Sequence, residues 1–148
     1  MKLLKLSPEQ LMTHWQYVKE CILLALPPFV NSTTDNILRI QEMLLVNTLE
    51  CWACINEISG QFYGIMTTQL TADEITQTRN LLIFSITLTE EHEDIIWDEG
   101  HAEMMKYAMA NNCANIIAYS NQPLVIEKAS KLGADVSWRM LNFPVFKN

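Results

Sequence analysis

TEEHEDIIWDEGHAEMMKYAMA, residues 89–110, is the stretch that decides the fold, because it reads as a helix set between two runs typical of strands. The run NLLIFSITL (80–88) precedes it and the run ANIIAY (114–119) follows it, and both are apolar enough to be buried strands. In many α/β proteins the joint between such a strand and such a helix binds phosphates, because free backbone N–H groups point outward there. The joint is therefore the first candidate for a binding site.

This joint is strongly acidic. The joint contains no Lys or Arg. Its six carboxylates are those of Glu90, Glu91, Glu93, Asp94, Asp98 and Glu99. Negative charges at the start of a helix interact favourably with the helix dipole. The same charges repel an incoming pyrophosphate, and this repulsion argues against a phosphate-bearing ligand at this position.

The composition fits one domain covering residues 1–148. A chain of 148 residues, 49% of them apolar, can bury a substantial core. Its net charge of −7 gives little support for binding nucleic acid. No apolar run approaches ~20 residues, and the start MKLLKLSPEQ lacks the apolar core of a signal peptide. We therefore expect a cytoplasmic protein with no membrane span.

Four cysteines occur, and two of them form a CxxC pattern at Cys51 and Cys54. Such a pair could indicate redox or metal chemistry. The surrounding run LECWACINEI reads as a strand, however, and strand residues three apart point to opposite faces. No second CxxC completes a zinc site. The pattern therefore favours buried, reduced cysteines.

Helix and strand signals before the central stretch give the first part of the expected order. Ser7, Pro8 and Gln10 form a helix start with a capping box, and the prolines at 27–28 end that helix. Capping residues at 32–35 begin a second helix. Strands are expected at 49–58 and 61–70, joined by Ser59-Gly60, and a polar loop at 71–79 follows them.

The second part of the order follows the strand at 114–119. A last helix leads from Pro123 through Leu132 and is closed by Gly133. Residues 136–141 and 143–146 can then form an antiparallel pair. The resulting order, ααβββαβαββ, describes an α/β fold with one mixed sheet and helices on both faces.

This order resembles that of the GNAT (Gcn5-related N-acetyltransferase) superfamily, over most of the chain. In that family the third helix opens with [R/Q]-x-x-G-x-[G/A], and the amides of this motif hold the pyrophosphate of acetyl-CoA. The matching run here is WDEGHA, in which Gly100 and Ala102 match, whereas Trp97 stands where Arg or Gln is expected. Asn121 matches an asparagine that often precedes the next helix. The resemblance thus implies Gly100, Ala102 and Asn121 as the cofactor-binding residues of an acetyltransferase.

The general acid of the family is missing from its matching position. In that family a tyrosine in a Y-x-K-x-G-F run often donates a proton to the leaving group. The corresponding run here is ASKLGA, and Ala129 stands at the position of the tyrosine. Because alanine has no proton to donate, the resemblance does not supply a catalytic residue.

Two starts are open for the helix within 89–110, and they differ in what Gly100 can do. A start near Asp98 would leave a bent loop of exposed amides that could bind phosphate. A start at Thr89 would place Gly100 inside the helix, where its amide bonds to the preceding turn. The density of Glu and Asp favours the earlier start.

The histidines and the remaining glutamates do not indicate a metal site or a catalytic site. His92 and His101 are nine residues apart, which is not the spacing of a metal pair, and with His14 they are expected at the surface. Glu57 or Glu103 could accept an amine proton in an acetyltransferase, but nothing nearby indicates a raised pKa. We therefore assign no metal site and no catalytic residue.

The tryptophans differ in their expected environments. Trp15, Trp52 and Trp138 fall on apolar faces and are expected in the core. Trp97 has two interpretations: exposed beside Gly100 it could anchor a protein partner, and buried it would fill the cofactor cleft. We assign Trp97 as the candidate partner-binding residue, with the loop at 71–79 as a second candidate surface.

The chain is also similar to small GNAT-like proteins carried by tailed bacteriophages, in LPP (26–28), CW (51–52), NLLIFS (80–85) and IIAYSNQP (116–123). Together with the acidic joint, this resemblance predicts a non-catalytic protein without a cofactor, which binds a protein partner or acts in virion assembly, and binds neither nucleic acid nor membrane. The alternative is an acetyl-CoA-dependent N-acetyltransferase acting on an amine of a small molecule or protein, since an acidic cleft favours a cationic substrate.

Overall fold

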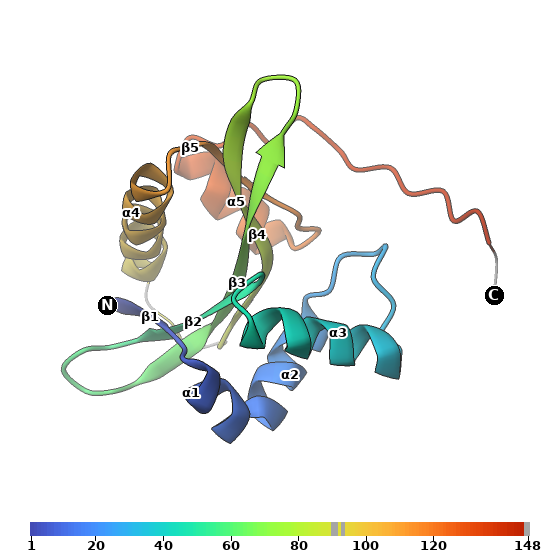
Figure 1. Ribbon diagram of the computed structural model, residues 1–148. Coiled ribbons are helices and arrows are strands. Elements are labelled where there is room, and N and C mark those ends of the chain that lie inside the picture. Colours follow the sequence, from blue (N-terminus) through green and yellow to red (C-terminus); the bar gives the residue numbers. More distant parts are fainter. Residues whose placement is uncertain (90–91, 93, 147–148) are drawn as a thin grey trace.

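A five-stranded sheet, in the order β1-β2-β3-β4-β5, forms the centre of the fold (Figure 1). The computed structural model describes residues 1–89, 92 and 94–146. The strands are β1 (Lys2–Lys5), β2 (Glu50–Ile55), β3 (Phe62–Asp73), β4 (Thr78–Leu88) and β5 (Cys113–Ala118). Neighbouring strands are antiparallel from β1 to β4, whereas β4 and β5 are parallel. The expectation of an α/β fold with a mixed sheet is confirmed.

Helices cover both faces of this sheet. They are α1 (Pro8–Thr13), α2 (Trp15–Leu24), α3 (Thr34–Leu45), α4 (Ile95–Ala110) and α5 (Pro123–Lys131). On one face α2 packs against β3 and β4, and α3 packs against β2. On the other face α4 crosses from β5 to β1. Among the described residues, none of these helices is long and apolar enough to cross a membrane.

Alternating residues of β2 supply both layers of the core. Cys51 packs with Val18 and Leu44 in the cluster beneath α1, α2 and α3, while Trp52 packs with Met104 in the cluster beneath α4. Side chains on a strand alternate between the two faces of the sheet, so β2 contributes to both clusters. The core holds α4 on the sheet at its first turn through Ile96 and further along through Met104 and Ala108, whereas Trp97 beside Ile96 is only half-buried.

The CxxC cysteines also follow this alternation. Cys51 lies in the cluster beneath α1 to α3, whereas Cys54 packs with Tyr63 and Ile96 on the opposite face. Both thiols are free and buried. Burial raises the pKa of Cys51 to about 12 and the pKa of Cys54 to about 11. The prediction that the two thiols leave opposite faces of one strand is confirmed.

The N-terminal part of the chain differs from expectation in two ways. The Ser7–Gln10 capping box is present, but the expected single helix is interrupted at His14, whose φ of −109° is not helical. Residues 2–5, to which no element was assigned, form the edge strand β1 against β2. A strand of only four residues carries too little alternation to be recognised without its partner.

The predicted loop at 71–79 is also wrong. Strands β3 and β4 continue through most of it and pair as far as Asp73 and Thr78, so only a four-residue turn remains. Asp73 Oδ1 accepts a hydrogen bond of 2.9 Å from the Thr76 amide within this turn. The segment is polar because this end of the hairpin extends beyond the core, and Ile75 at its tip is 95% exposed.

The expected strand pair at 136–141 and 143–146 is absent from the described part of the chain. After α5 the chain runs away from the sheet as an extended segment (Figure 1). Trp138, expected in the core, is 84% exposed. The apolar alternation of this segment is typical of a strand, but a strand needs an edge to pair with, and the segment reaches none. The observed order is therefore βαααβββαβα.

Candidate functional site

Strands β4 and β5 part from each other halfway along β4. They pair from Arg79↔Cys113 to Ile83↔Ala118, and there β5 ends. β4 continues to Leu88 without a described strand on that side. Unpaired backbone N–H and C=O groups at a sheet edge are available to another extended chain. The point where β4 and β5 separate is therefore a candidate site for a ligand.

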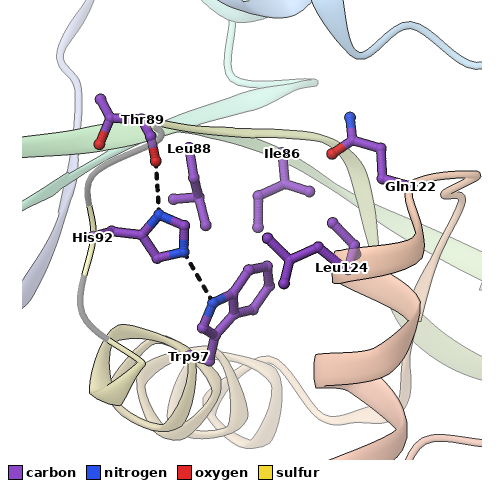
Figure 2. A pocket seen from close by; sticks show the side chains of 8 residues that line it. Ile86, Leu88, Thr89, His92, Trp97, Gln122 and Leu124 are labelled. Atoms are coloured by element: carbon purple, nitrogen blue, oxygen red, sulfur yellow. Dashed lines mark hydrogen bonds between the residues drawn. The ribbon is translucent and has the colours of Figure 1, made fainter.

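A cavity of about 330 Å³ lies at this parting (Figure 2). Most of its lining is apolar, and its residues are Ile86, Leu88, Thr89, His92, Trp97, Gln122, Leu124 and Val125. They come from the end of β4, the approach to α4, the first turn of α4 and the start of α5. The joint picked out by the sequence is thus one wall of a real cavity, and α5 supplies the opposite wall.

Trp97 and His92 form one side of the cavity (Figure 2). The indole Nε1 of Trp97 donates a hydrogen bond of 3.3 Å to Nε2 of His92, and Nδ1 of His92 lies 2.6 Å from the Thr89 carbonyl oxygen. Because the indole nitrogen can only donate, His92 must be neutral with its proton on Nδ1. His92 is therefore a half-buried positioning group, which corrects the expectation of a surface histidine.

Helix α4 begins between the two starts considered from the sequence. Asp94 is its N-cap and Ile95 its first residue, so Gly100 and Ala102 lie within the helix. Only the first four N–H groups of a helix lack an internal partner, and these belong to residues before Gly100. The amides of this helix that lack a helical partner are therefore those near Ile95 and Ile96. Gly100 lies inside the helix, as the favoured earlier start implied, and the bent loop that the later start would have left is not formed at 100–102.

Asn121, which the family resemblance implied as a cofactor residue of an acetyltransferase, lies beside the cavity lining and not in it. Asn121 is exposed and is not among the residues that line the cavity, whereas its neighbour Gln122 is. Gln122 is the N-cap of α5 and its side chain makes no capping hydrogen bond. Its amide group is therefore free to meet a ligand. Sequence reasoning stopped at Asn121. It missed three lining residues that come within the next four positions: Gln122, Leu124 and Val125.

The acidic joint acquires a basic partner from α5. Lys128 Nζ lies 2.9 Å from Asp94 Oδ1, and its hydrogen bond holds the pKa of Asp94 below its usual range. Glu99 pairs with the N-terminal amine of Met1 at 3.0 Å. Glu90, Glu91 and Glu93 lie outside the described residues. The local sequence therefore overstated the negative charge, because it could not show Lys128.

The remaining candidates lie away from the cavity. Glu103 pairs with Lys106 at 3.3 Å, and Glu57 is exposed in the turn between β2 and β3. His101 is exposed, and within the described residues there is no group of ligands that could hold a metal ion. Ala129 is half-buried in α5 and does not line the cavity. The described lining has no free acid or base.

Comparisons with known proteins identify the fold. No family model and no curated protein matches the sequence. Solved structures do match: a probable acetyltransferase aligns over 100% of both chains with a TM-score of 0.73 and 10% identity. Glucosamine-6-phosphate N-acetyltransferase from Arabidopsis thaliana aligns over 98% of both chains, with a TM-score of 0.67 and 11% identity.

A third structure is named as a predicted acetyltransferase with acetyl-CoA, from Clostridium acetobutylicum. It covers 95% of both chains, with a TM-score of 0.66 and 15% identity. At such identities the agreement concerns the fold alone. Over nearly its whole length, this chain has the GNAT fold of N-acetyltransferases.

Proposed function

We propose that this chain is an acetyl-CoA-dependent N-acetyltransferase acting on an amine of a small molecule or a protein. The observation that carries the proposal is the apolar cavity where β4 and β5 part. A concave, mainly apolar site with a few polar groups is the usual form of a small-molecule site. The fold, which this chain has in common with acetyltransferases, supports the same choice of ligand.

The residues present fit part of this cofactor. A volume of about 330 Å³ lies at the lower end of the range for ligand sites, and it suits an extended arm better than a whole nucleotide. The unpaired backbone of β4 beyond Ile83 can bond to the amides of such an arm, as an added strand would. When bound, acetyl-CoA would supply an acetyl group activated as a thioester.

The chain's own side chains have separate tasks in this proposal. Leu124, Val125 and Trp97 exclude water from the arm, and the Gln122 amide orients it. The free amides at the start of α4, with Lys128 close by, favour negative charge at the mouth of the cavity. The motif of the family would place Arg or Gln at the position of Trp97. In this chain Lys128, which pairs with Asp94, supplies a positive charge near the start of α4 instead.

The acceptor in this proposal is a cationic amine that loses its proton before it reacts. A protein of net charge −7 attracts cations, and Asp98 is exposed on the first turn of α4. With acetyl-CoA bound, the neutral amine nitrogen would form a bond to the thioester carbon while the carbon–sulfur bond breaks and sulfur leaves as a thiolate. Both nitrogens of His92 are engaged, so the ammonium proton would be lost to water before the attack, and the proton that nitrogen sheds on forming the amide would pass to the departing thiolate.

The test is calorimetry with acetyl-CoA, followed by an acetylation assay with a polyamine. Leu124→Trp should fill the cavity and abolish binding, while the matched change Leu38→Trp, at an equally exposed position on α3, should leave binding intact. Failure of the unmodified protein to bind acetyl-CoA would overturn the proposal. Binding that Leu124→Trp does not reduce would place the cofactor elsewhere.

A second function, binding of a protein partner without catalysis, rests on the absence of a free acid or base in the described cavity lining. Trp97 would be the anchor, half-buried and already oriented by His92. The bacteriophage and virion roles rest on sequence resemblance alone, and none of the names of the three structures described above refers to them. Trp97→Ala, folded but unable to hold a partner, would support this function if acetyl-CoA does not bind.

A further inference from the structure

We propose that residues 135–146 of one copy of this chain add a strand to the free edge of β5 in a second copy, so that the protein forms a dimer by reciprocal exchange. The inference is independent of acetyl-CoA binding and of catalysis. It rests on three observations: an unprotected sheet edge, an extended apolar segment that leaves the domain, and a C-terminal region in which no described residue is fully buried.

The two edges of the sheet differ in chemistry. The edge strand β1 is only four residues long and carries Lys2 and Lys5 at its ends. Lysines and short length are common means of preventing a sheet edge from pairing with another chain. The opposite edge strand β5, with the sequence CANIIA, has no charge and no proline. The sequence protects one edge and leaves the other able to pair.

The segment after Gly133 is built to occupy such an edge. Over residues 136–140 the apolar Val136, Trp138 and Met140 alternate with the polar Ser137 and Arg139, as in a strand. Trp138 is 84% exposed and Phe143 is 83% exposed, which is costly for large apolar side chains in water. Figure 1 shows the segment running away from its own sheet. Its twelve residues can extend about 40 Å, enough to reach another molecule.

Strand β5 and helix α5, which precede this segment, are also poorly buried. Between Met109 and Phe146 no described residue is buried. α5 makes few contacts with other elements, and Ile117 and Tyr119 at the end of β5 are each about 40% exposed. A strand placed beside β5 would cover these side chains. A region of this length without a buried residue is therefore better explained as half of an interface.

A second copy is the occupant that the charges favour. The protein is acidic, so a docking segment must avoid repulsion. Within 135–146 the only charged residues are Asp135 and Arg139, which cancel, and β5 is uncharged. Within the described part of the chain, no other extended apolar segment lies outside the sheet and helices. Exchange between two copies satisfies both free edges at once, as a closed two-fold dimer requires.

The experiment measures the mass of the full chain by light scattering across a concentration series, with amide hydrogen exchange on the same samples. The expected mass is twice 17.0 kDa, with the amides of 136–141 and of β5 protected together. Trp138→Ser should raise the dimer dissociation constant at least about tenfold, because Trp138 shares the apolar face of the segment with Val136 and Met140 and would be a buried anchor. Ile58→Ser, at a residue 99% exposed on a different turn, is the matched control and should change nothing.

Ile117→Lys tests the other partner of the interface, because it places on β5 the kind of charge that β1 already carries. It should also produce a monomer, with the circular dichroism spectrum of the unmodified protein. A monomer whose segment is protected at every concentration would mean docking on its own sheet, and would overturn the proposal. A monomer with an unprotected segment, or a dimer that neither variant weakens, would overturn it equally.

Discussion

The hydroxyl of Tyr107 in α4 donates a hydrogen bond to the carboxylate of Glu50 at the start of β2. Glu50 is only 5% exposed, and Lys5 Nζ lies 2.9 Å from the same oxygen. The Tyr107 ring also meets Trp52 edge to face at 4.9 Å. These contacts join α4 to β1 and β2 and hold the helix that carries Trp97. Burial and the bond to Glu50 raise the pKa of Tyr107.

Tyr107→Phe should destabilise the domain by about 2 kcal/mol, because the buried Glu50 carboxylate loses a hydrogen bond while the ring is retained. Urea unfolding followed by circular dichroism would measure the change. Tyr119→Phe, at a half-exposed ring near the end of β5, is the control and should change stability by less than about 0.5 kcal/mol. An equal effect of both substitutions would mean that the bond to Glu50 adds nothing.

Lys128→Met should raise the pKa of Asp94 toward its ordinary value. In the native protein the hydrogen bond from Lys128 lowers this pKa, so the pair stabilises the fold above the ordinary Asp pKa. That contribution disappears as the pH falls through the lowered pKa of Asp94. Carboxyl-carbon NMR titration measures both values directly. Lys131→Met, which removes a more distant charge, should give a smaller shift of the same sign.

Cys113 should react with iodoacetamide well before Cys51 or Cys54 in the native protein. Burial raises the pKa of Cys51 to about 12 and of Cys54 to about 11, so both carry little thiolate near neutral pH. Cys113 is only partly buried. Mass spectrometry of peptides after timed labelling would give the order. The same spectra should contain no 51–54 disulfide, and finding one would contradict the opposite-face geometry.

Gly100→Ala should stabilise the domain by up to ~1 kcal/mol, because glycine inside a helix is unfavourable relative to alanine. An added Cβ would meet only Met1 Cε, at an ordinary 3.6 Å. Thermal unfolding would measure the gain. The substitution should leave acetyl-CoA binding unchanged, and a loss of binding without a loss of stability would instead indicate that the backbone at Gly100 touches the cofactor.

Local signals predicted the parts of this fold that depend on neighbouring residues. The capping box at Ser7 and the alternation that separates Cys51 from Cys54 need only a few residues, and both were correct. The α/β class followed from the order of strongly apolar runs. The strand β1 was missed because its evidence is the partner strand β2, which lies far along the chain.

The sequence singled out one wall of the candidate cavity but not the other. The joint before α4 does line the cavity, whereas Lys128, Gln122 and Leu124 come from a helix that the sequence places 25 residues or more after that joint. The family motif pointed to Gly100, but helix geometry assigns the free amides to the residues around Ile95. Trp138 was wrongly expected in the core because apolar alternation does not reveal whether a partner strand is available.

The parting of β4 and β5 has a consequence for how such a cavity can persist. Beyond Ile83 the sheet offers a ligand the same main-chain groups that it would have offered a neighbouring strand. Every residue except proline carries both of these groups, so recognition of this kind tolerates almost any exchange of side chains. Recognition through the main chain is therefore compatible with a fold that is shared at only the 10–15% identity found here. A search for side-chain motifs can therefore miss a site of this kind even where the backbone that forms it is retained.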